Sequence, residues 1–256
     1  MMSRNLVSLI SITRKESTRI FRIWVQTLVP PVITMTLYFI IFGQLIGSQL
    51  RDVGGYDYMA FIAPGLIMMS IITNSYTNTV SSFFSAKFQR NVEELLVSPT
   101  PDYVIVLGYV SGGMVRGLCV GLLVSVVSLF FTGITLFNIG YVIVFGVLTS
   151  FVFSLAGMIN GIFAKKFDDI SIIPTFVITP LTYFGGVFYS LALLPDFWQS
   201  LSRINPIVYM IDGFRYGFLG ISDIPVAVGL GMLVLFSVIL FCVNLYLLKK
   251  GIGIRS

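Results

Sequence analysis

The chain has 256 residues, of which 56% are hydrophobic and 11% are charged, and its formal net charge is +5. Soluble proteins contain about 25% charged residues, so this composition excludes an ordinary soluble protein and indicates an integral membrane protein. The excess of positive charge lies mainly in the segments between apolar runs, and we therefore expect no nucleic-acid partner.

The first 22 residues contain five arginines and lysines among apolar residues with helical spacing. This pattern predicts a basic amphipathic helix that lies in the inner headgroup layer. We expect Trp24 where the chain enters the membrane. The segment has no small-residue cleavage site after a short apolar region, so we expect no removable signal peptide.

Six apolar runs follow, and each is long enough to cross about 30 Å of hydrocarbon as a helix. They are apolar on all sides, which argues against the alternating pattern of a membrane β-barrel. The predicted fold is an all-α integral membrane protein with one domain over residues 1–256. The expected spans are about 23–46, 58–83, 103–131, 139–163, 170–190 and 225–248.

The loops between these spans differ strongly in charge. Residues 1–22, 84–102, 164–169 and 249–256 contain 12 lysines and arginines, whereas residues 47–57, 132–138 and 191–224 contain three. Basic loops stay in the cytoplasm. We therefore expect both termini to be cytoplasmic.

Residues 85–99 form a charged, amphipathic island between the second and third spans. On one helix, apolar residues fall on one side and charged residues on the others, until Pro99 and Pro101 end it. We expect a short cytoplasmic docking helix; the alternative is a loop helix that rests on the membrane. The apolar residues are Phe88, Val92, Leu95 and Leu96, and the charged ones are Lys87, Arg90, Glu93 and Glu94.

The third span combines small residues with one charge. Gly113, Gly117 and Gly121 have the four-residue spacing that lets helix backbones approach closely, either within the bundle or at a dimer seam. Arg116 is a charged residue within a span, where such residues usually face the bundle interior or water. It could contact an anionic substrate group, or it could reach the headgroups or a backbone carbonyl.

The connection between the fourth and fifth spans is short and charged. It contains Lys165, Lys166, Asp168 and Asp169. We expect either a second cytoplasmic contact or a charged turn that only fixes the topology.

The connection from 191 to 224 is too apolar for a solvated loop, but its apolar pieces are too short to span. Such runs indicate a re-entrant helical hairpin. Pro195 can begin the first helix, and Asn205 followed by Pro206 supplies a cap for the second. Asp212 and Arg215 lie three residues apart on that second helix and could pair.

Over residues 178–215 the chain resembles the signature of the ABC-2 permease family, the membrane half of a class of ATP-driven exporters. Phe184 departs from it, since a smaller residue is expected there. Similarity extends along the chain through WVQTLVPPVITMTLYFIIFG, FIAPGLIMMS, KFQRNVEELLVSP and FAKKFDDIS. The matching signature residues are Ile178, Leu181, Gly185, Val187, Leu194, Pro195, Pro206, Ile207, Tyr209 and Arg215.

This resemblance implies a six-helix half-transporter in a bacterial inner membrane, working as a homodimer with two cytoplasmic ATPase subunits. It also implies that the island at 85–99 is the coupling helix, which a cleft on the ATPase receives. Its four apolar residues would be the anchors and its four charged residues the rim.

The chain itself lacks the residues for nucleotide chemistry. It contains no G-x-x-x-x-G-K-[S/T] phosphate loop, so we expect ATP and Mg²⁺ to bind the partner, and no cofactor, metal or catalytic residue here. The absence of histidine, and of acids in the spans, argues against a proton-coupled carrier. We expect a permease for a hydrophobic or amphipathic substrate. The alternatives are a flippase for a lipid or lipid-linked glycan, an ATP-independent channel or carrier, and a membrane scaffold.

Overall fold

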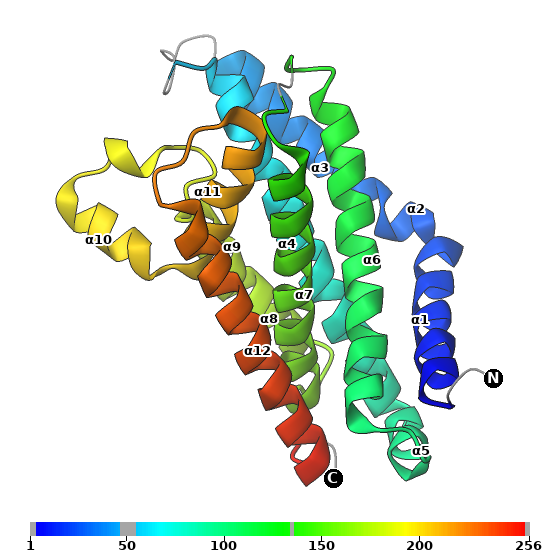
Figure 1. Cartoon of the computed structure of the whole chain (residues 1–256). Helices are drawn as coiled ribbons and strands as arrows, with labels where there is room; N and C mark the ends of the chain where they lie inside the picture. The colour runs from blue at the N-terminus through cyan, green and yellow to red at the C-terminus, as the bar shows by residue number, and fades with distance from the viewer. Residues whose placement is uncertain (1–3, 47–54, 134–135, 254–256) are drawn as a thin grey trace.

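The computed structural model describes residues 4–46, 55–133 and 136–253. Arg51 and Arg255, which entered the charge comparison, lie outside these residues. Within the described part, helices joined by loops build one bundle (Figure 1). The helices are α1 (Arg4–Arg22), α2 (Trp24–Thr27), α3 (Val29–Tyr38), η1 (Phe39–Ile46), α4 (Tyr58–Phe88), α5 (Asn91–Val97), α6 (Asp102–Ser128), α7 (Ile139–Phe163), α8 (Asp169–Ile173), η3 (Pro174–Ile178), α9 (Thr179–Tyr183), η4 (Leu191–Leu193), α10 (Asp196–Ile204), α11 (Pro206–Leu219) and α12 (Val226–Lys250).

Among the described residues, five helical segments are long and apolar enough to cross a membrane. They are Trp24–Gly43, Tyr58–Phe88, Asp102–Ser128, Ile139–Phe163 and Val226–Lys250. They confirm the helical class and correspond to five of the six predicted spans.

The expected span at 170–190 is the exception. The structure has three consecutive segments of five residues there, α8, η3 and α9, which end at Tyr183. Fifteen helical residues reach about 22 Å, less than the roughly 30 Å of hydrocarbon. Pro174 and Pro180 remove two backbone donors, and a π-helical turn lies between them. The sixth span, expected at 170–190, therefore remains a prediction.

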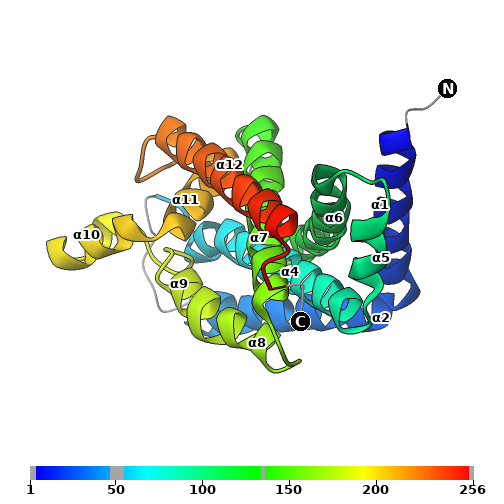
Figure 2. The same cartoon turned by 90° about the horizontal axis from the view of Figure 1, so that it is seen from below.

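Helix α4 forms the centre of the bundle. It has 31 residues, and most of its side chains are buried. Seen from below, it lies between α6, α7 and the first helices of the chain (Figure 2). Small residues permit this packing: an added Cβ at Gly157 of α7 would lie 2.5 Å from the carbonyl oxygen of Tyr76 on α4.

Helix α1 confirms the predicted N-terminal helix over its described residues, and it lies lengthwise against the first half of α6. Asn5 donates to the hydroxyl of Tyr103 over 3.0 Å, and the hydroxyls of Thr13 and Ser111 lie 2.9 Å apart. Because both contacts join residues 98 positions apart, the two helices run in the same direction. The placement of α1 in the headgroup layer stays a prediction.

The region before α12 contains two helices, α10 and α11, and α10 projects sideways from the bundle (Figure 1). The predicted cap is confirmed: the side-chain oxygen of Asn205 accepts from the backbone N–H of Ile207 over 3.0 Å, and Pro206 is the first residue of α11. Re-entry of this hairpin into the membrane stays a prediction.

Candidate functional site

The predicted docking island is not one helix. Its first residues are the last turn of α4, which ends at Phe88, and α5 begins only at Asn91. Between them Arg90 has a φ of 62°, in the left-handed region that residues other than glycine rarely adopt. The prediction of a single helix over 85–99 was wrong because the chain turns sharply at this residue.

Three of the four predicted anchors also face their own bundle, and only Phe88 is exposed. Val92 is 0% exposed and packs in a core cluster with Phe83 and Ile105, so its assignment as an anchor for a partner was wrong. Leu95 and Leu96 are half-buried against the same cluster. The apolar stripe of α5 therefore attaches this helix to its own bundle.

Lys87 has a structural position instead of the predicted rim position. Its ammonium group donates to the carbonyl oxygens of Ile162 and Ala164 at 2.5 and 2.8 Å. These oxygens belong to the carboxyl end of α7, where free carbonyls favour a positive charge. Lys87 thus ties the end of α4 to the end of α7.

A set of exposed residues remains at this end of the molecule, and we call it the tip surface. Phe88 is 63% exposed and Val97 is 88% exposed, which leaves apolar area next to exposed charges. Phe167 contacts Phe88 with ring centroids 5.3 Å apart. The tip surface consists of Phe88, Arg90, Glu93, Glu94, Val97 and Phe167.

The contact through Phe167 brings the second predicted cytoplasmic segment beside the first. In that segment Asp169 accepts from the backbone N–H groups of Lys165 and Lys166 at 2.8 and 3.0 Å. These bonds hold the pKa of Asp169 below its usual value. Asp169 therefore shapes the turn, while Lys165, Lys166 and Asp168 are exposed.

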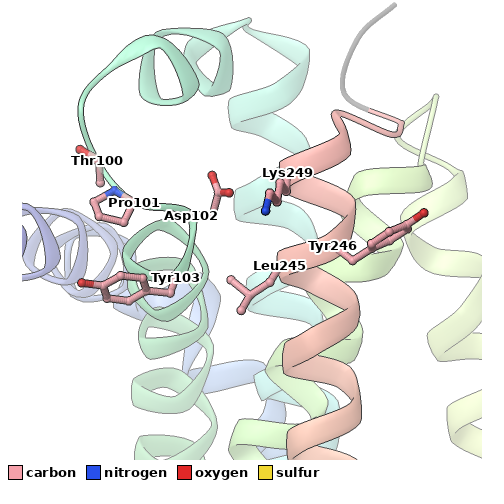
Figure 3. A pocket seen from close by; sticks show the side chains of 7 residues that line it. All are labelled: Thr100, Pro101, Asp102, Tyr103, Leu245, Tyr246 and Lys249. Atoms are coloured by element: carbon pink, nitrogen blue, oxygen red, sulfur yellow. The ribbon is translucent and has the colours of Figure 1, made fainter.

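A surface pocket of about 560 Å³ lies near the tip, between the start of α6 and the end of α12. Figure 3 shows Asp102 and Lys249 projecting into the space between the two helices, with Tyr103 below. The pocket therefore has a charge of each sign at its mouth.

In the signature hairpin the matched residues have structural contacts. Arg215 is buried, places its guanidinium 3.9 Å from the ring centroid of Phe61 and donates to the carbonyl of Gly186 over 2.5 Å. Asp212 accepts from the backbone N–H groups of Asp223 and Ile224, each over 3.0 Å. The expected direct pair between Asp212 and Arg215 is not among the ion pairs of the described residues.

The other signature residues shape the same region. Tyr209 donates to the carbonyl of Arg203 over 2.8 Å and so joins α11 to α10. Leu194 directly follows η4, and Pro195 directly precedes α10. A second pocket, of about 530 Å³ and mostly apolar, lies between α9 and α10. Phe184 and Trp198 line it with their rings stacked 6.4 Å apart.

The glycines of the third span pack inside the chain. A Cβ added to Gly113 would clash with the hydroxyls of Thr79 and Ser154, and one added to Gly117 would clash with the hydroxyl of Ser75. A Cβ at Gly121 would lie 2.5 Å from the side chain of Ile71. These contacts fit the packing interpretation and leave the glycines no free surface for a dimer seam.

A polar cluster lies at the junction of α1, α4 and α6, and we did not predict it from the sequence. Glu16 is only 1% exposed and accepts from Ser82 over 2.6 Å and from Arg19 over 3.1 Å. Arg19 also donates to Asn78 over 3.0 Å. The spacing of Ile12, Glu16 and Ile20 contained the signal, because these residues share one face of a helix.

The chain matches the family model described as "ABC-2 type transporter" over residues 7–219. It is 62% identical over 256 residues, the full length of both chains, to "Inner membrane transport permease YadH" of Escherichia coli (strain K12). It is 27% identical over 215 residues to "Nodulation protein J" of Rhizobium leguminosarum bv. trifolii, a match that covers 84% of this chain and 82% of that protein.

Proposed function

Because this chain belongs to the ABC-2 type transporter family, whose members include transport permeases, we propose that it is the membrane subunit of an ATP-driven exporter in a bacterial inner membrane. It works as a homodimer with two copies of a separate cytoplasmic ATPase subunit, which binds ATP and Mg²⁺. Both of its termini are cytoplasmic.

The composition of the tip surface supports the proposal that the ATPase docks there. The exposed apolar rings of Phe88 and Phe167 lie together, and the exposed charges of Arg90, Glu93 and Glu94 follow in the next turn and in α5. An apolar centre with a charged rim is the usual composition of a protein interface. Since α4 leads directly from this surface into the bundle, movement of the tip moves the central helix.

Docking is tested with the Phe88→Ser, Phe167→Ser double variant. The ATPase is first identified by co-purification with the wild-type chain, and its ATP hydrolysis is then measured in proteoliposomes. We expect co-purification and stimulated hydrolysis to fall about tenfold, because anchor residues dominate interface affinity. The matched control is Phe197→Ser, since Phe197 is 70% exposed and lies on α10. Wild-type co-purification by the double variant would exclude the tip as the docking surface.

The substrate of the proposed exporter is hydrophobic or amphipathic. The mostly apolar pocket between α9 and α10 supports this class, because such pockets bind ligands chiefly through apolar contacts. Efflux of an amphipathic dye from proteoliposomes that contain the ATPase tests it. Dye movement that requires ATP agrees with the proposal, and movement without ATP indicates a channel or carrier.

A second candidate is a flippase for a lipid or lipid-linked glycan. It is favoured by the stacked pair of Phe184 and Trp198, which are 55% and 44% exposed and could stack on a sugar ring. Transfer of a fluorescent lipid between leaflets, measured in the same proteoliposomes, distinguishes the two candidates.

A further inference from the structure

The polar cluster between α1, α4 and α6 is built around one buried carboxylate. An added Cβ on Gly112 would lie 2.7 Å from the Cβ of Glu16, so the side chain of Glu16 occupies space that only a glycine leaves open. Its partners are Arg19 on α1 and Ser82 on α4. Glu16 is thus closely packed in the interior, whereas the side chain of Arg19 is 35% exposed.

Arg116 adds an unpaired charge to this cluster. It lies one helical turn beyond Gly112 on the same face of α6, and it is close enough to Arg19 for their charges to interact. Within the described part of the chain, Arg116 has no hydrogen bond or ion pair, and its Nε is buried. The buried Nε of Arg19 also lacks a partner there. Two guanidinium groups therefore lie near each other, and only that of Arg19 is paired with a carboxylate, Glu16.

The packing of α1 indicates the depth of this site in the membrane. Arg14 and Lys15 are exposed on α1, where it lies beside the first turns of α6. Exposed charges do not lie in hydrocarbon, so this part of α6 is at headgroup level. After Tyr103, the large exposed apolar side chains of α6 begin at Leu122. Arg116 lies between these two regions, at the boundary between headgroups and hydrocarbon.

We infer that Arg19 and Arg116 bind the phosphate group of an amphiphile in the leaflet beside α1. Guanidinium groups bind phosphate through paired N–H donors, and basic pockets between membrane helices bind anionic headgroups. Bound phosphate supplies the negative charge that Glu16 alone does not. The site needs neither an ATPase nor transport, so it goes beyond the proposed function and is tested separately from it.

The test uses the purified, delipidated chain in detergent. Native mass spectrometry measures binding of phosphatidylglycerol and, for comparison, of diacylglycerol, which has the same chains without phosphate. We expect the wild-type chain to prefer phosphatidylglycerol at least tenfold, and Arg116→Gln to lose that preference. Arg116→Lys keeps the charge without the paired donors, and we expect it to retain part of the preference.

The control is Arg14→Gln, which removes the same charge from an exposed position on α1. We expect it to bind within twofold of the wild type. Added inorganic phosphate distinguishes the sources: displacement of the lipid shows that phosphate alone suffices, and its failure to compete shows that a lipid headgroup is required. The inference is overturned if the wild type shows no preference for phosphate, or if Arg14→Gln and Arg116→Gln lose it equally. If Arg116→Gln does not fold, the comparison uses Arg116→Lys, and a preference equal to that of Arg14→Gln would overturn the inference.

Discussion

Lys87 illustrates how one side chain can hold two helix ends together. Its ammonium group bonds two carbonyls at the end of α7, and hydrogen bonds to charged groups contribute about 1.5–3 kcal/mol each. We expect Lys87→Met to lower the free energy of unfolding by about 2 kcal/mol. Thermal unfolding in detergent measures the change. Lys166→Met is the control because Lys166 is exposed, and an equal effect there would contradict the role of Lys87.

Gly117 offers a second test at the residue scale, because the hydroxyl of Ser75 occupies the space of its missing side chain. Overpacking of this kind costs about 1–3 kcal/mol, so we expect Gly117→Ala to destabilise the bundle by this amount. The Gly117→Ala, Ser75→Ala double variant removes the clashing hydroxyl and should recover part of the loss. Without any recovery, the α4–α6 contact described above would be incorrect.

Single residues also show where sequence patterns reach their limit. The spacing of Gly113 and Gly117 correctly indicated close helix approach, because the sequence itself shows which residues lack a Cβ. Lys87 was placed on a solvated rim because its partners lie 75 and 77 residues away in the chain. Val92 was placed on a docking face because an amphipathic stripe does not reveal whether its own chain or a partner covers it.

At the scale of elements, α5 is a short helix that its own core holds in place. Val92 provides this attachment, so Val92→Asp places an unpaired charge in an apolar cluster. We expect α5 to detach and trypsin to cleave faster after Arg90, which a time course with gel analysis detects. Val97→Asp is the control, since Val97 is 88% exposed. Unchanged cleavage in Val92→Asp would mean that α5 does not depend on this contact.

The lengths of the elements were predictable to different degrees. The apolar runs gave α4, α6, α7 and α12 within a few residues, because a span must match the membrane thickness. The segment at 170–190 has a similar composition, but two prolines and a turn divide it. Composition alone does not show how neighbouring helices accommodate the donors that proline removes.

At the scale of the whole molecule, the distribution of charge predicts which end of the bundle faces the cytoplasm. The tip and the loop after α6 lie on opposite sides in this topology. We expect an impermeant maleimide to label Gly133→Cys but not Gln89→Cys in intact cells, with Cys119 and Cys242 replaced by serine. Gly133 has open space around its Cβ position, and Gln89 is exposed. The reverse labelling pattern would invert the topology.

The continuous, buried α4 has one more consequence for the molecule as a transporter. A helix of 31 residues is about 46 Å long, so one continuous helix extends from the tip to the far end of the bundle. Free-energy coupling between two sites is reciprocal. If docking at the tip alters the affinity for a ligand at the opposite end through α4, that ligand must alter the affinity for the ATPase by the same factor. The strength of ATPase binding at the tip would then depend on whether the transporter holds a substrate.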